Sequence, residues 1–254
     1  MRRNRLRHSK NLRQIEGRNP VLELLRSEAQ VVRVIFEEKI RQEDRLREIF
    51  HLIRERQLET KRLSRKALDK ISKTAVHQGV IAWAEWPDEP SVAFILEKVK
   101  NENREPLFVL LPQVTYEQNL GAVLRTAEAV AADAVIVSKR APELTPVVSR
   151  VAMGATEHIP LIHENIFSVI RLLRKEGIKL VAADLNSKHS LYDTNLTGPM
   201  ALVIGDEHKG ISGPVIDKVD IKVKIPMFGK INSLNLSVAT GILLYEVIRQ
   251  RNLA

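Results

Sequence analysis

Three short segments of this chain combine small polar side chains with glycine, and each follows an apolar stretch typical of a buried strand. They read QVTYEQNLGAVLRT at 113–126, GDEHKGIS at 205–212 and MFGKINSLNLS at 227–237. Ligands bind beyond the carboxyl ends of the strands in open parallel sheets, so the three segments together predict one site. The candidate residues are Asn119, Gly121 and Arg125 in the first segment, Gly205, Glu207 and Gly210 in the second, and Asn232, Ser233, Asn235 and Ser237 in the third.

Each segment also has an ordinary structural interpretation. Asn119 suits a helix N-cap, and Arg125 suits a solvated position with its aliphatic stem on apolar neighbours. Residues 205–210 suit a plain turn; their glycines have the spacing of a phosphate-binding P-loop, but Ile211 stands where the lysine is required. The chain contains no G-x-G-x-x-G fingerprint of a dinucleotide site. Taken singly, the segments leave the choice between structure and chemistry open.

The start of the last helix carries more polar side chains than capping needs. We expect this helix to run from Leu234 onward, with Ser233 and Ser237 on one face and Asn235 on another. One N-cap, at Asn232 or Ser233, would use only one of these side chains. We therefore expect the helix start to face a ligand on one side and the core on the other, with backbone donors within the ligand's reach.

Alternating strands and helices place these segments. The strands expected in this part of the chain are 106–112, 134–138, 158–164, 178–184, 200–207 and 221–226. They are continuous apolar runs rather than alternating ones, which indicates a parallel sheet covered on both faces. The sequence therefore predicts an α/β domain whose strand ends carry the candidate site.

The first third of the chain is a separate basic module. Residues 1–86 hold 21 Lys and Arg against 12 Asp and Glu, whereas residues 87–254 hold 19 of each, so the net charge of +9 lies wholly in the first part. Such a surface attracts a polyanion through counterion release, and nucleic acid explains it better than solubility does. Helices are expected in this module at 19–28 and 43–57, and strands at 31–38 and 78–86.

Tryptophan, proline and acidic residues at 83–91 mark a linker between the two modules. We therefore expect four parts in the chain. These are a basic tail (1–12), a small α/β domain (13–86), a linker with a first helix (87–104) and the parallel-sheet domain (105–254).

Composition excludes several classes of protein and site. The chain has no cysteine, which excludes disulfides and Cys-ligated zinc, and its histidines show no ligand spacing, so we assign no metal. Its apolar runs are too short to span a bilayer, and we expect no membrane partner. The basic first residues lack the apolar core of a secretory signal. A cytoplasmic protein is the simplest interpretation, with an organellar transit peptide as the alternative.

The three segments together resemble the motifs of the SpoU (TrmH-type) family of RNA ribose 2′-O-methyltransferases, in the SPOUT superfamily. NLGAVLRTAEA resembles the first motif, GDEHKG the second, Gly-x-Glu-x-x-Gly, and IPMFGKINSLNLS the third. The resemblance covers 105–254 closely and 14–86 more loosely, where IEGRNPVLELL and HQGVIA resemble a small RNA-binding domain related to ribosomal proteins. The chain departs from the pattern at TYEQ, where many relatives have Asp-Pro before the asparagine, and at Met153, where a serine is common. These departures concern loop shape and substrate rather than the reaction.

The resemblance implies a C-terminal trefoil knot, S-adenosylmethionine as cofactor, RNA as substrate and a homodimer whose site uses both chains. It assigns catalytic roles to Arg125, Asn119, Glu207, Ser233 and Asn235, and cofactor binding to Gly205, Ile225, Met227 and Leu234.

The implied function is methylation of a ribose 2′-hydroxyl, and a guanosine of 23S rRNA is the expected target. Small tRNA enzymes of the family usually lack the N-terminal module, so residues 1–86 favour large-subunit rRNA over tRNA. The alternatives are a tRNA 2′-O-methyltransferase, a catalytically silent RNA-binding relative and an unrelated small-molecule enzyme. A silent relative would lack Arg125, Glu207 or Asn235, and all three are present.

Overall fold

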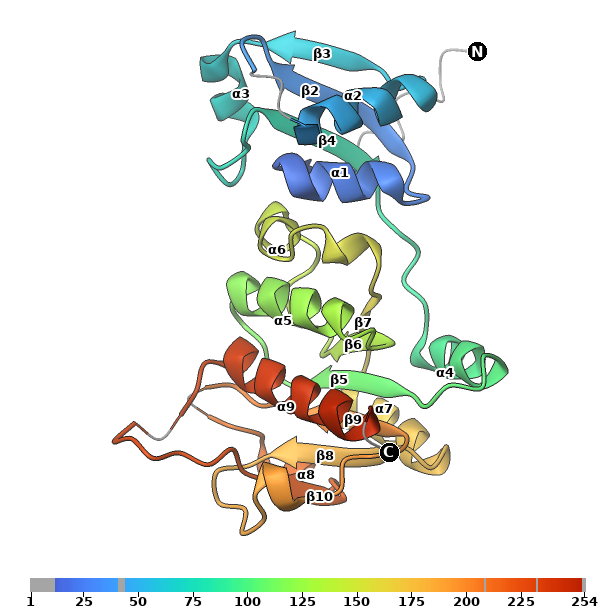
Figure 1. Ribbon diagram of the computed structural model, residues 1–254, viewed down its shortest axis with the longest axis vertical. Helices are drawn as coiled ribbons and strands as arrows, with labels where there is room; N and C mark the ends of the chain where they lie inside the picture. The colour runs from blue at the N-terminus through green and yellow to red at the C-terminus, as the bar shows by residue number, and fades with distance from the viewer. Residues whose placement is uncertain (1–11, 41–43, 208, 232, 253–254) are drawn as a thin grey trace. The chain divides into compact units, whose positions relative to one another are not determined.

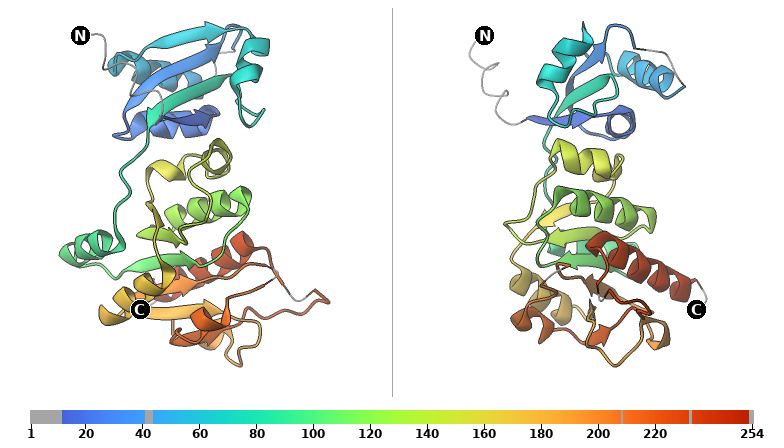
Figure 2. Two further views of the ribbon diagram at one scale, coloured as in Figure 1. Left: turned by 180° about the vertical axis from the view of Figure 1, so that it is seen from behind. Right: turned by 90° about the vertical axis from the view of Figure 1, so that its left-hand side faces the viewer.

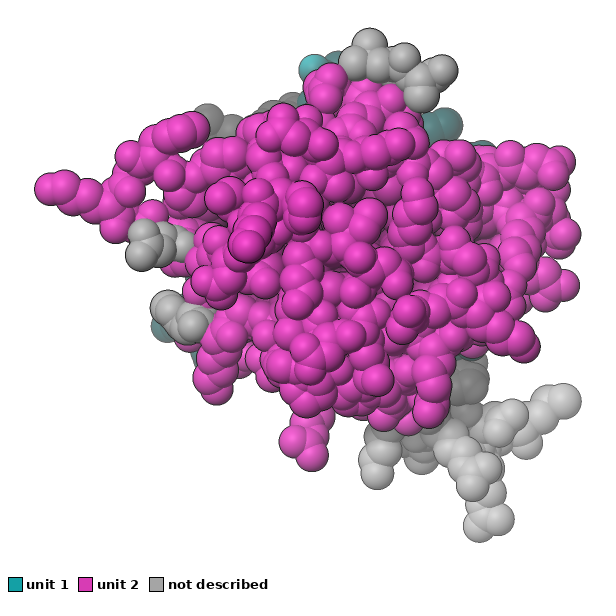
Figure 3. Space-filling view, turned by 90° about the horizontal axis from the view of Figure 1, so that it is seen from below, with its two compact units in different colours: residues 1–88, 143–158 teal, residues 89–142, 159–254 magenta. Residues whose placement is uncertain are grey.

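The computed structural model describes residues 12–40, 44–207, 209–231 and 233–252 (Figure 1). They form two compact units, coloured separately in Figure 3. Unit 1 comprises the described residues of 1–88 and 143–158, and unit 2 those of 89–142 and 159–254. The division expected from the sequence did not place 143–158 with the first unit, and its domain boundaries stay a prediction. The tail expected at 1–12 lies outside the described residues except for Leu12.

Unit 1 is built on a four-stranded sheet with the order β1-β4-β2-β3. The first three of these strands pair antiparallel, and β3 pairs parallel to β2 at the edge. The strands are β1 (Leu12–Glu16), β2 (Val31–Glu37), β3 (Thr60–Leu63) and β4 (Val80–Glu85).

Helices cover both faces of this sheet (Figure 2). The helices of unit 1 are α1 (Arg18–Arg26), α2 (Asp44–Glu55), α3 (Arg65–Ile71) and α6 (Pro146–Val151), with a 3₁₀ turn η2 (Ala155–Glu157). Buried residues of α1 and α2 pack on one face around Phe36. On the other face, Leu68 of α3 packs on Ile35 and Ile81. The elements β1, β3 and α3 were missed in the sequence because they are short and mostly polar.

Unit 2 is built on a six-stranded sheet with the order β10-β8-β9-β5-β6-β7, and its strand pairs are parallel, as the apolar runs predicted (Figure 1). The strands are β5 (Leu107–Leu111), β6 (Ala134–Val137), β7 (Leu161–His163), β8 (Lys179–Ala183), β9 (Met200–Val203) and β10 (Ile221–Val223).

Helices lie on both sides of this second sheet as well. They are α4 (Val92–Asn101), α5 (Glu117–Ala129), α7 (Ile166–Lys175), α8 (Gly213–Ile216) and α9 (Leu236–Arg251), with a 3₁₀ turn η3 (Leu191–Asp193). One core cluster joins α4 and α7 to Phe108 and Leu110 of β5. The alternate residues Val109 and Leu111 point to the other face and are equally buried. The helices α5 and α9 lie against each other in unit 2. No helix among the described residues has the length and apolar character needed to cross a membrane.

Candidate functional site

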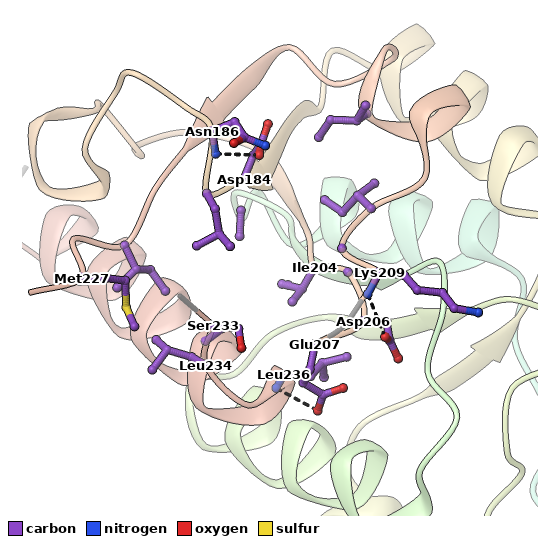
Figure 4. Close-up of a pocket in the computed structure, with 18 residues that line it drawn as sticks. Asp184, Asn186, Ile204, Asp206, Glu207, Lys209, Met227, Ser233, Leu234 and Leu236 are labelled. Carbon is purple, nitrogen blue, oxygen red and sulfur yellow. Dashed lines mark hydrogen bonds between the residues drawn. The ribbon is translucent and has the colours of Figure 1, made fainter. Parts of the chain in front are cut away.

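The carboxyl ends of β8, β9 and β10 open onto one cavity of about 400 Å³ (Figure 4). Seven of the residues proposed from the sequence line it: Gly205, Glu207, Gly210, Ile225, Met227, Ser233 and Leu234. The other lining residues are Ala183, Asp184, Leu185, Asn186, Ile204, Asp206, Lys209, Ile211, Ile216, Leu236 and Ala239. The second and third segments of the sequence therefore meet in one place, as the strand-end rule predicted.

Glu207 is the centre of a hydrogen-bond cluster that joins all three segments. Its Oε1 accepts from Asn119 Nδ2 at 2.5 Å, from Asn235 Nδ2 at 3.1 Å and from the backbone N–H of Leu236 at 3.1 Å. Asn235 Nδ2 also donates to Asn119 Oδ1 at 2.9 Å. One carboxylate thus fixes two amide side chains and the first residue of α9, because hydrogen bonds to a charged acceptor are the strong ones.

Asn235 immediately precedes α9 and caps its first turn. Its Oδ1 accepts from the backbone N–H of Ser237 at 3.0 Å and from Ser237 Oγ at 2.6 Å, so Asn235 is the N-cap. The helix therefore starts at Leu236 rather than Leu234, and the expectation that Ser233 and Ser237 share a helix face is wrong. Asn232, the other capping candidate, lies outside the described residues. Ser233 instead lines the cavity with Leu234.

Asn119 is not an N-cap, because α5 begins two residues earlier at Glu117 and follows Tyr116, which makes no side-chain cap bond. Its amide is bonded to Glu207 and Asn235, which lie 88 and 116 residues further along the chain. The capping interpretation of Asn119 is therefore excluded, and the amide belongs to the cluster.

Arg125 does not join this cluster. It is exposed on α5 and does not line the cavity. It follows Asn119 by six residues, which turns its side chain about 120° around the helix axis from the asparagine. Within the part of the chain that the structure describes, its guanidinium forms no hydrogen bond or ion pair.

Gly205 permits the tight turn that carries Glu207. A Cβ at this position would lie 2.2 Å from the carbonyl carbon of Gly210 and 2.5 Å from the nitrogen of Ile211. The turn is closed by a two-way backbone pairing, in which Gly210 N donates to Asp206 O at 2.8 Å and Asp206 N donates to Gly210 O at 3.2 Å. Only glycine fits where two backbone segments approach this closely.

The cavity wall also contains polar residues that the sequence did not single out. Asp184 and Asn186 follow β8, and Asp184 Oδ1 accepts from the backbone N–H of Asn186 at 2.9 Å. Figure 4 shows this pair across the cavity from Ser233 and Leu234. The segment after β8 reads DLNS, so extending the strand-end rule to a fourth strand would have found them.

The charge of the wall favours a ligand with a positive group. The lining residues include three acidic ones, Asp184, Asp206 and Glu207, and one basic one, Lys209. Apolar residues, among them Ile204, Ile225 and Leu234, complete the wall. Among the described residues, no cluster of three or more His, Asp or Glu could hold a metal ion. His208 lies outside them.

Comparisons with known protein families match both parts of the chain. The model of the SpoU rRNA Methylase family matches residues 106–245. A second model, RNA 2′-O ribose methyltransferase substrate binding, matches residues 14–89. The first match alone spans more than half of the chain.

Among individual proteins, the chain is similar to the 23S rRNA (guanosine-2′-O-)-methyltransferase RlmB of Escherichia coli, with 36% identity over 94% of this chain and 98% of the relative. RlmB of Photobacterium profundum is 39% identical over 86% of this chain and 90% of its own length. The fold is similar to a crystal structure of an RNA 2′-O ribose methyltransferase, with a TM-score of 0.82, 26% identity and coverage of 98% of this chain and 92% of the other. The fold is also similar to the SpoU methyltransferase AviRb of Streptomyces viridochromogenes in complex with AdoMet. That comparison has a TM-score of 0.80 and 25% identity, and it covers 100% of this chain and 95% of the other. The chain therefore belongs to the SpoU rRNA methylase family.

Proposed function

We propose that this protein transfers a methyl group from S-adenosylmethionine to the ribose 2′-hydroxyl of a guanosine in 23S rRNA. The observation that carries the proposal is the cluster of Asn119, Glu207 and Asn235 beside the cavity formed after β8, β9 and β10. Its support from relatives is that two RlmB proteins named for this reaction match over most of their length.

The cavity fits the cofactor. Its volume of about 400 Å³ falls within the range of roughly 300–1,000 Å³ common for small-molecule pockets. Gly205, Ile225, Met227 and Leu234 would hold the cofactor, with the apolar side chains against its adenine and the carboxylates of the wall near its positive charge. When bound, S-adenosylmethionine supplies an activated methyl group on a positively charged sulfur.

The reaction needs an in-line approach and the loss of a weakly acidic hydroxyl proton. Positioning the two reactants contributes up to about 7–11 kcal/mol. Asn119, Ser233 and Asn235 are the groups that orient the ribose and the cofactor, with Glu207 holding the two amides in place. A guanidinium does not give up its proton in proteins, so Arg125 acts as a cation beside the developing 2′-oxyanion and not as the base. The proton leaves to a phosphate oxygen of the substrate or to water.

The position of Arg125 supports a homodimer in which each site takes residues from both chains. Arg125 is exposed and turned away from the cluster of its own chain. Val238 and Tyr245, seven residues apart on α9, are 49% and 57% exposed and lie on one helix face, which a second copy would cover.

A mixture of two inactive variants tests this arrangement. Arg125→Ala and Glu207→Gln chains, mixed equally and allowed to exchange, form mixed dimers in which one site is fully intact. We expect about a quarter of the wild-type activity, because half of the dimers are mixed and each mixed dimer has one intact site out of two. An inactive mixture, with dimer exchange verified by mass, contradicts a shared site.

We also propose a trefoil knot at the C-terminus. In support, the loop after β8 runs beside the chain leaving β10 in a parallel bridge between Ser190 and Lys224. Leu191 N donates to Lys224 O at 2.9 Å there, and Lys224 N donates to His189 O at 2.9 Å. Gln250 of α9 then bonds the same loop at Leu196 N and Thr194 O. The last turn of α9 thus lies against a loop that precedes it by about 55 residues, as the two bonds' separations of 54 and 56 indicate.

Large-subunit rRNA is favoured over tRNA by the extent of the matches. The structure of the A. aeolicus TrmH/SpoU tRNA modifying enzyme is similar over 85% of its own chain but over only 63% of this one. The RlmB relatives cover 86% and 94% of this chain, which includes the RNA-binding module proposed for residues 13–86. We place the reaction in the cytoplasm, since these relatives are bacterial enzymes of rRNA.

The function is tested by mapping ribose 2′-O-methylation across rRNA and tRNA from a strain that lacks the gene. The purified protein, with S-adenosylmethionine, should restore the missing mark on the corresponding 23S rRNA fragment. Loss of a tRNA mark with rRNA unchanged would assign the tRNA alternative, and unchanged RNA with no transfer in vitro would leave the catalytically silent relative.

A further inference from the structure

The positive charge of unit 1 is concentrated in one short segment of its described residues. Residues 61–73 hold six Lys and Arg and a single Asp. Residues 12–60 hold ten basic and ten acidic residues, and residues 74–86 hold one Glu and no Lys or Arg. We call the six cations of 61–73 the basic strip: Lys61, Arg62, Arg65, Lys66, Lys70 and Lys73.

All six side chains of the basic strip are exposed. Lys61 and Arg62 lie on β3, the edge strand of the sheet, and Arg65, Lys66 and Lys70 lie on α3, which follows it directly. The strip therefore follows β3 and α3 along one border of unit 1, with Arg62 over the Phe50 ring of α2, on the face of the sheet opposite α3.

Helix stability does not account for these charges. Arg65 and Lys66 lie in the first turn of α3, where a cation opposes the helix dipole, and this turn has no acidic residue. Lys66 and Lys70 are four residues apart, a spacing at which like charges repel and destabilise a helix. Lys70 lies in the last turn, where a cation favours the helix dipole, so Arg65 and Lys66 are the cations that oppose it, and we look for a compensating anion outside the helix.

The chain's own carboxylates neutralise only part of the strip. Lys61 lies 3.6 Å from Glu59, and Arg65 lies 3.5 Å from Glu37. Asp69 Oδ1 is bonded to His77 Nε2 at 2.8 Å and reaches Arg65 only at 4.0 Å. Within the described residues, Lys66, Lys70 and Lys73 have no ion pair.

Buried polar groups fix the backbone at the end of the strip. Gln14 Nε2 donates to Ile71 O at 2.8 Å, at the end of α3. Glu16, which is fully buried, accepts from Ser72 Oγ at 2.7 Å, from the backbone N–H of Lys73 at 2.6 Å and from Thr74 Oγ1 at 2.6 Å. The backbone that carries Lys73 is therefore held in place before binding, which lowers the entropy cost of ordering it.

We propose that the basic strip is the surface on which unit 1 binds the phosphodiester backbone of the RNA substrate. This rests on the proposed function, which supplies an RNA substrate. Ammonium and guanidinium groups recognise phosphates without reading the bases, so the strip provides affinity and register, and the target nucleotide is chosen elsewhere. The other basic segment of the module, 1–11, lies outside the described residues.

The test compares two full-length variants that each lose three positive charges from unit 1. One is Lys66→Gln/Lys70→Gln/Lys73→Gln in the strip. The matched control is Arg45→Gln/Arg47→Gln/Arg54→Gln, in which three exposed arginines of α2 are replaced. Binding of a 23S rRNA fragment is measured across salt concentrations, and S-adenosylmethionine binding by calorimetry.

We expect the strip variant to bind the fragment about 50-fold more weakly at 0.15 M salt, with the slope of log K against log salt smaller by about 2 to 3. The control should change by less than twofold, and kcat at saturating RNA and cofactor affinity should stay at the wild-type values in both. A strip variant with wild-type affinity and slope overturns the inference, as does a control that loses as much as the strip variant.

The two proposals fail in different ways. If the wild-type protein methylates no RNA, the proposed function is wrong. If it methylates 23S rRNA and the strip variant does so with an unchanged KM, only the strip is wrong. Circular dichroism verifies folding; should the triple variant be unfolded, Lys70→Gln alone carries the test, with an expected slope change of about 0.7 to 0.9.

Discussion

Replacing Gly205 by alanine should disrupt the proposed cofactor site through a clash that no side chain can relieve. The added Cβ would lie 2.2 Å from Gly210 C, 2.4 Å from Gly210 O and 2.5 Å from Ile211 N, all of them backbone atoms. Carbon atoms in contact lie about 3.5–4.0 Å apart, so the backbone at Gly210 must move away by about 1.3 Å or more. That movement breaks the pairing of Asp206 with Gly210 and shifts Glu207, which lies inside the turn.

The size of the effect follows from this geometry. Overpacking of this kind costs about 1–3 kcal/mol, and the hydrogen bonds that Glu207 accepts are worth roughly 1.5–3 kcal/mol each when they are made to a charged group. The cofactor needs the turn in its closed form, so we expect its dissociation constant to rise about 5- to 150-fold, the equivalent of 1–3 kcal/mol.

Isothermal calorimetry with S-adenosylmethionine measures this change directly. Gly213→Ala is the matched control, because a Cβ there has no atom within 4 Å and Gly213 has no positive φ. The control should bind the cofactor like the wild type. A Gly205→Ala variant with wild-type cofactor affinity would refute the reasoning, since the turn would then not form part of the binding site.

Three further substitutions probe other parts of the molecule. Arg125→Ala should lower kcat by about 10²–10³, the usual cost of losing one oxyanion-stabilising group, and calorimetry should show unchanged cofactor affinity; near-normal turnover would show that Arg125 is misassigned. Asn235→Asp keeps a capping oxygen for α9, but it removes both N–H donors of the amide and places a second carboxylate against Glu207. Methylation should therefore be lost, while the melting temperature falls by only a few degrees. Retained activity would contradict the role of the amide. Burial raises the pKa of Glu16, but hydrogen bonds from Ser72, Thr74 and the backbone of Lys73 outweigh it and hold this pKa below its ordinary value. The stability that this lowered pKa provides is present above the unfolded-state pKa of about 4.3 and is lost as pH falls through the lower folded-state pKa. Glu16→Gln should therefore destabilise unit 1 at pH 7, and the loss of stability relative to the wild type should shrink on acidification. Thermal melts that show a constant loss of stability from pH 7 to pH 3 would contradict this.

The parallel sheet and the meeting of the strand ends could be predicted because burial alone dictates them. Strands such as Leu107–Leu111 and Ala134–Val137 are apolar throughout and fully buried, and runs this short favour strands of a parallel sheet over buried helices. Once the sheet is parallel, its carboxyl ends share an edge, and the polar segments after β9 and β10 must lie near one another.

The start of α9 could not be predicted from the sequence, because several good capping residues compete there. Asn232, Ser233 and Asn235 all suit an N-cap, and Leu234 and Leu236 both suit a first apolar position. The choice is made by Glu207, which lies 28 residues before Asn235 and accepts from its amide and from the backbone N–H of Leu236. The first residue of α9 is therefore decided by a contact that exists only in the folded chain.

The placement of residues 143–158 in unit 1 likewise has no local signal. Arg13 and Glu157 form a two-bond ion pair at 2.7 and 2.5 Å, with side chains only 2% and 3% exposed. A buried arginine on a strand and a glutamate 144 residues later suggest nothing to a reader of the sequence. Which residues pair in this way depends on the topology of the fold, and the periodicity of apolar residues in the sequence carries no information about it.

The arrangement of α5 connects catalysis to assembly. Asn119 and Arg125 lie on one helix, and their separation of six residues directs them about 120° apart, so Arg125 points away from the cluster that Asn119 forms with Glu207 in the same chain. An arginine that is exposed and without a partner in the described residues samples many rotamers, and a cation must be held in place before the reaction to stabilise developing charge. In the proposed dimer, the second chain both orders this side chain and supplies the cavity it acts on. The isolated chain could then hold the cofactor through β8, β9 and β10 but could not complete the transfer.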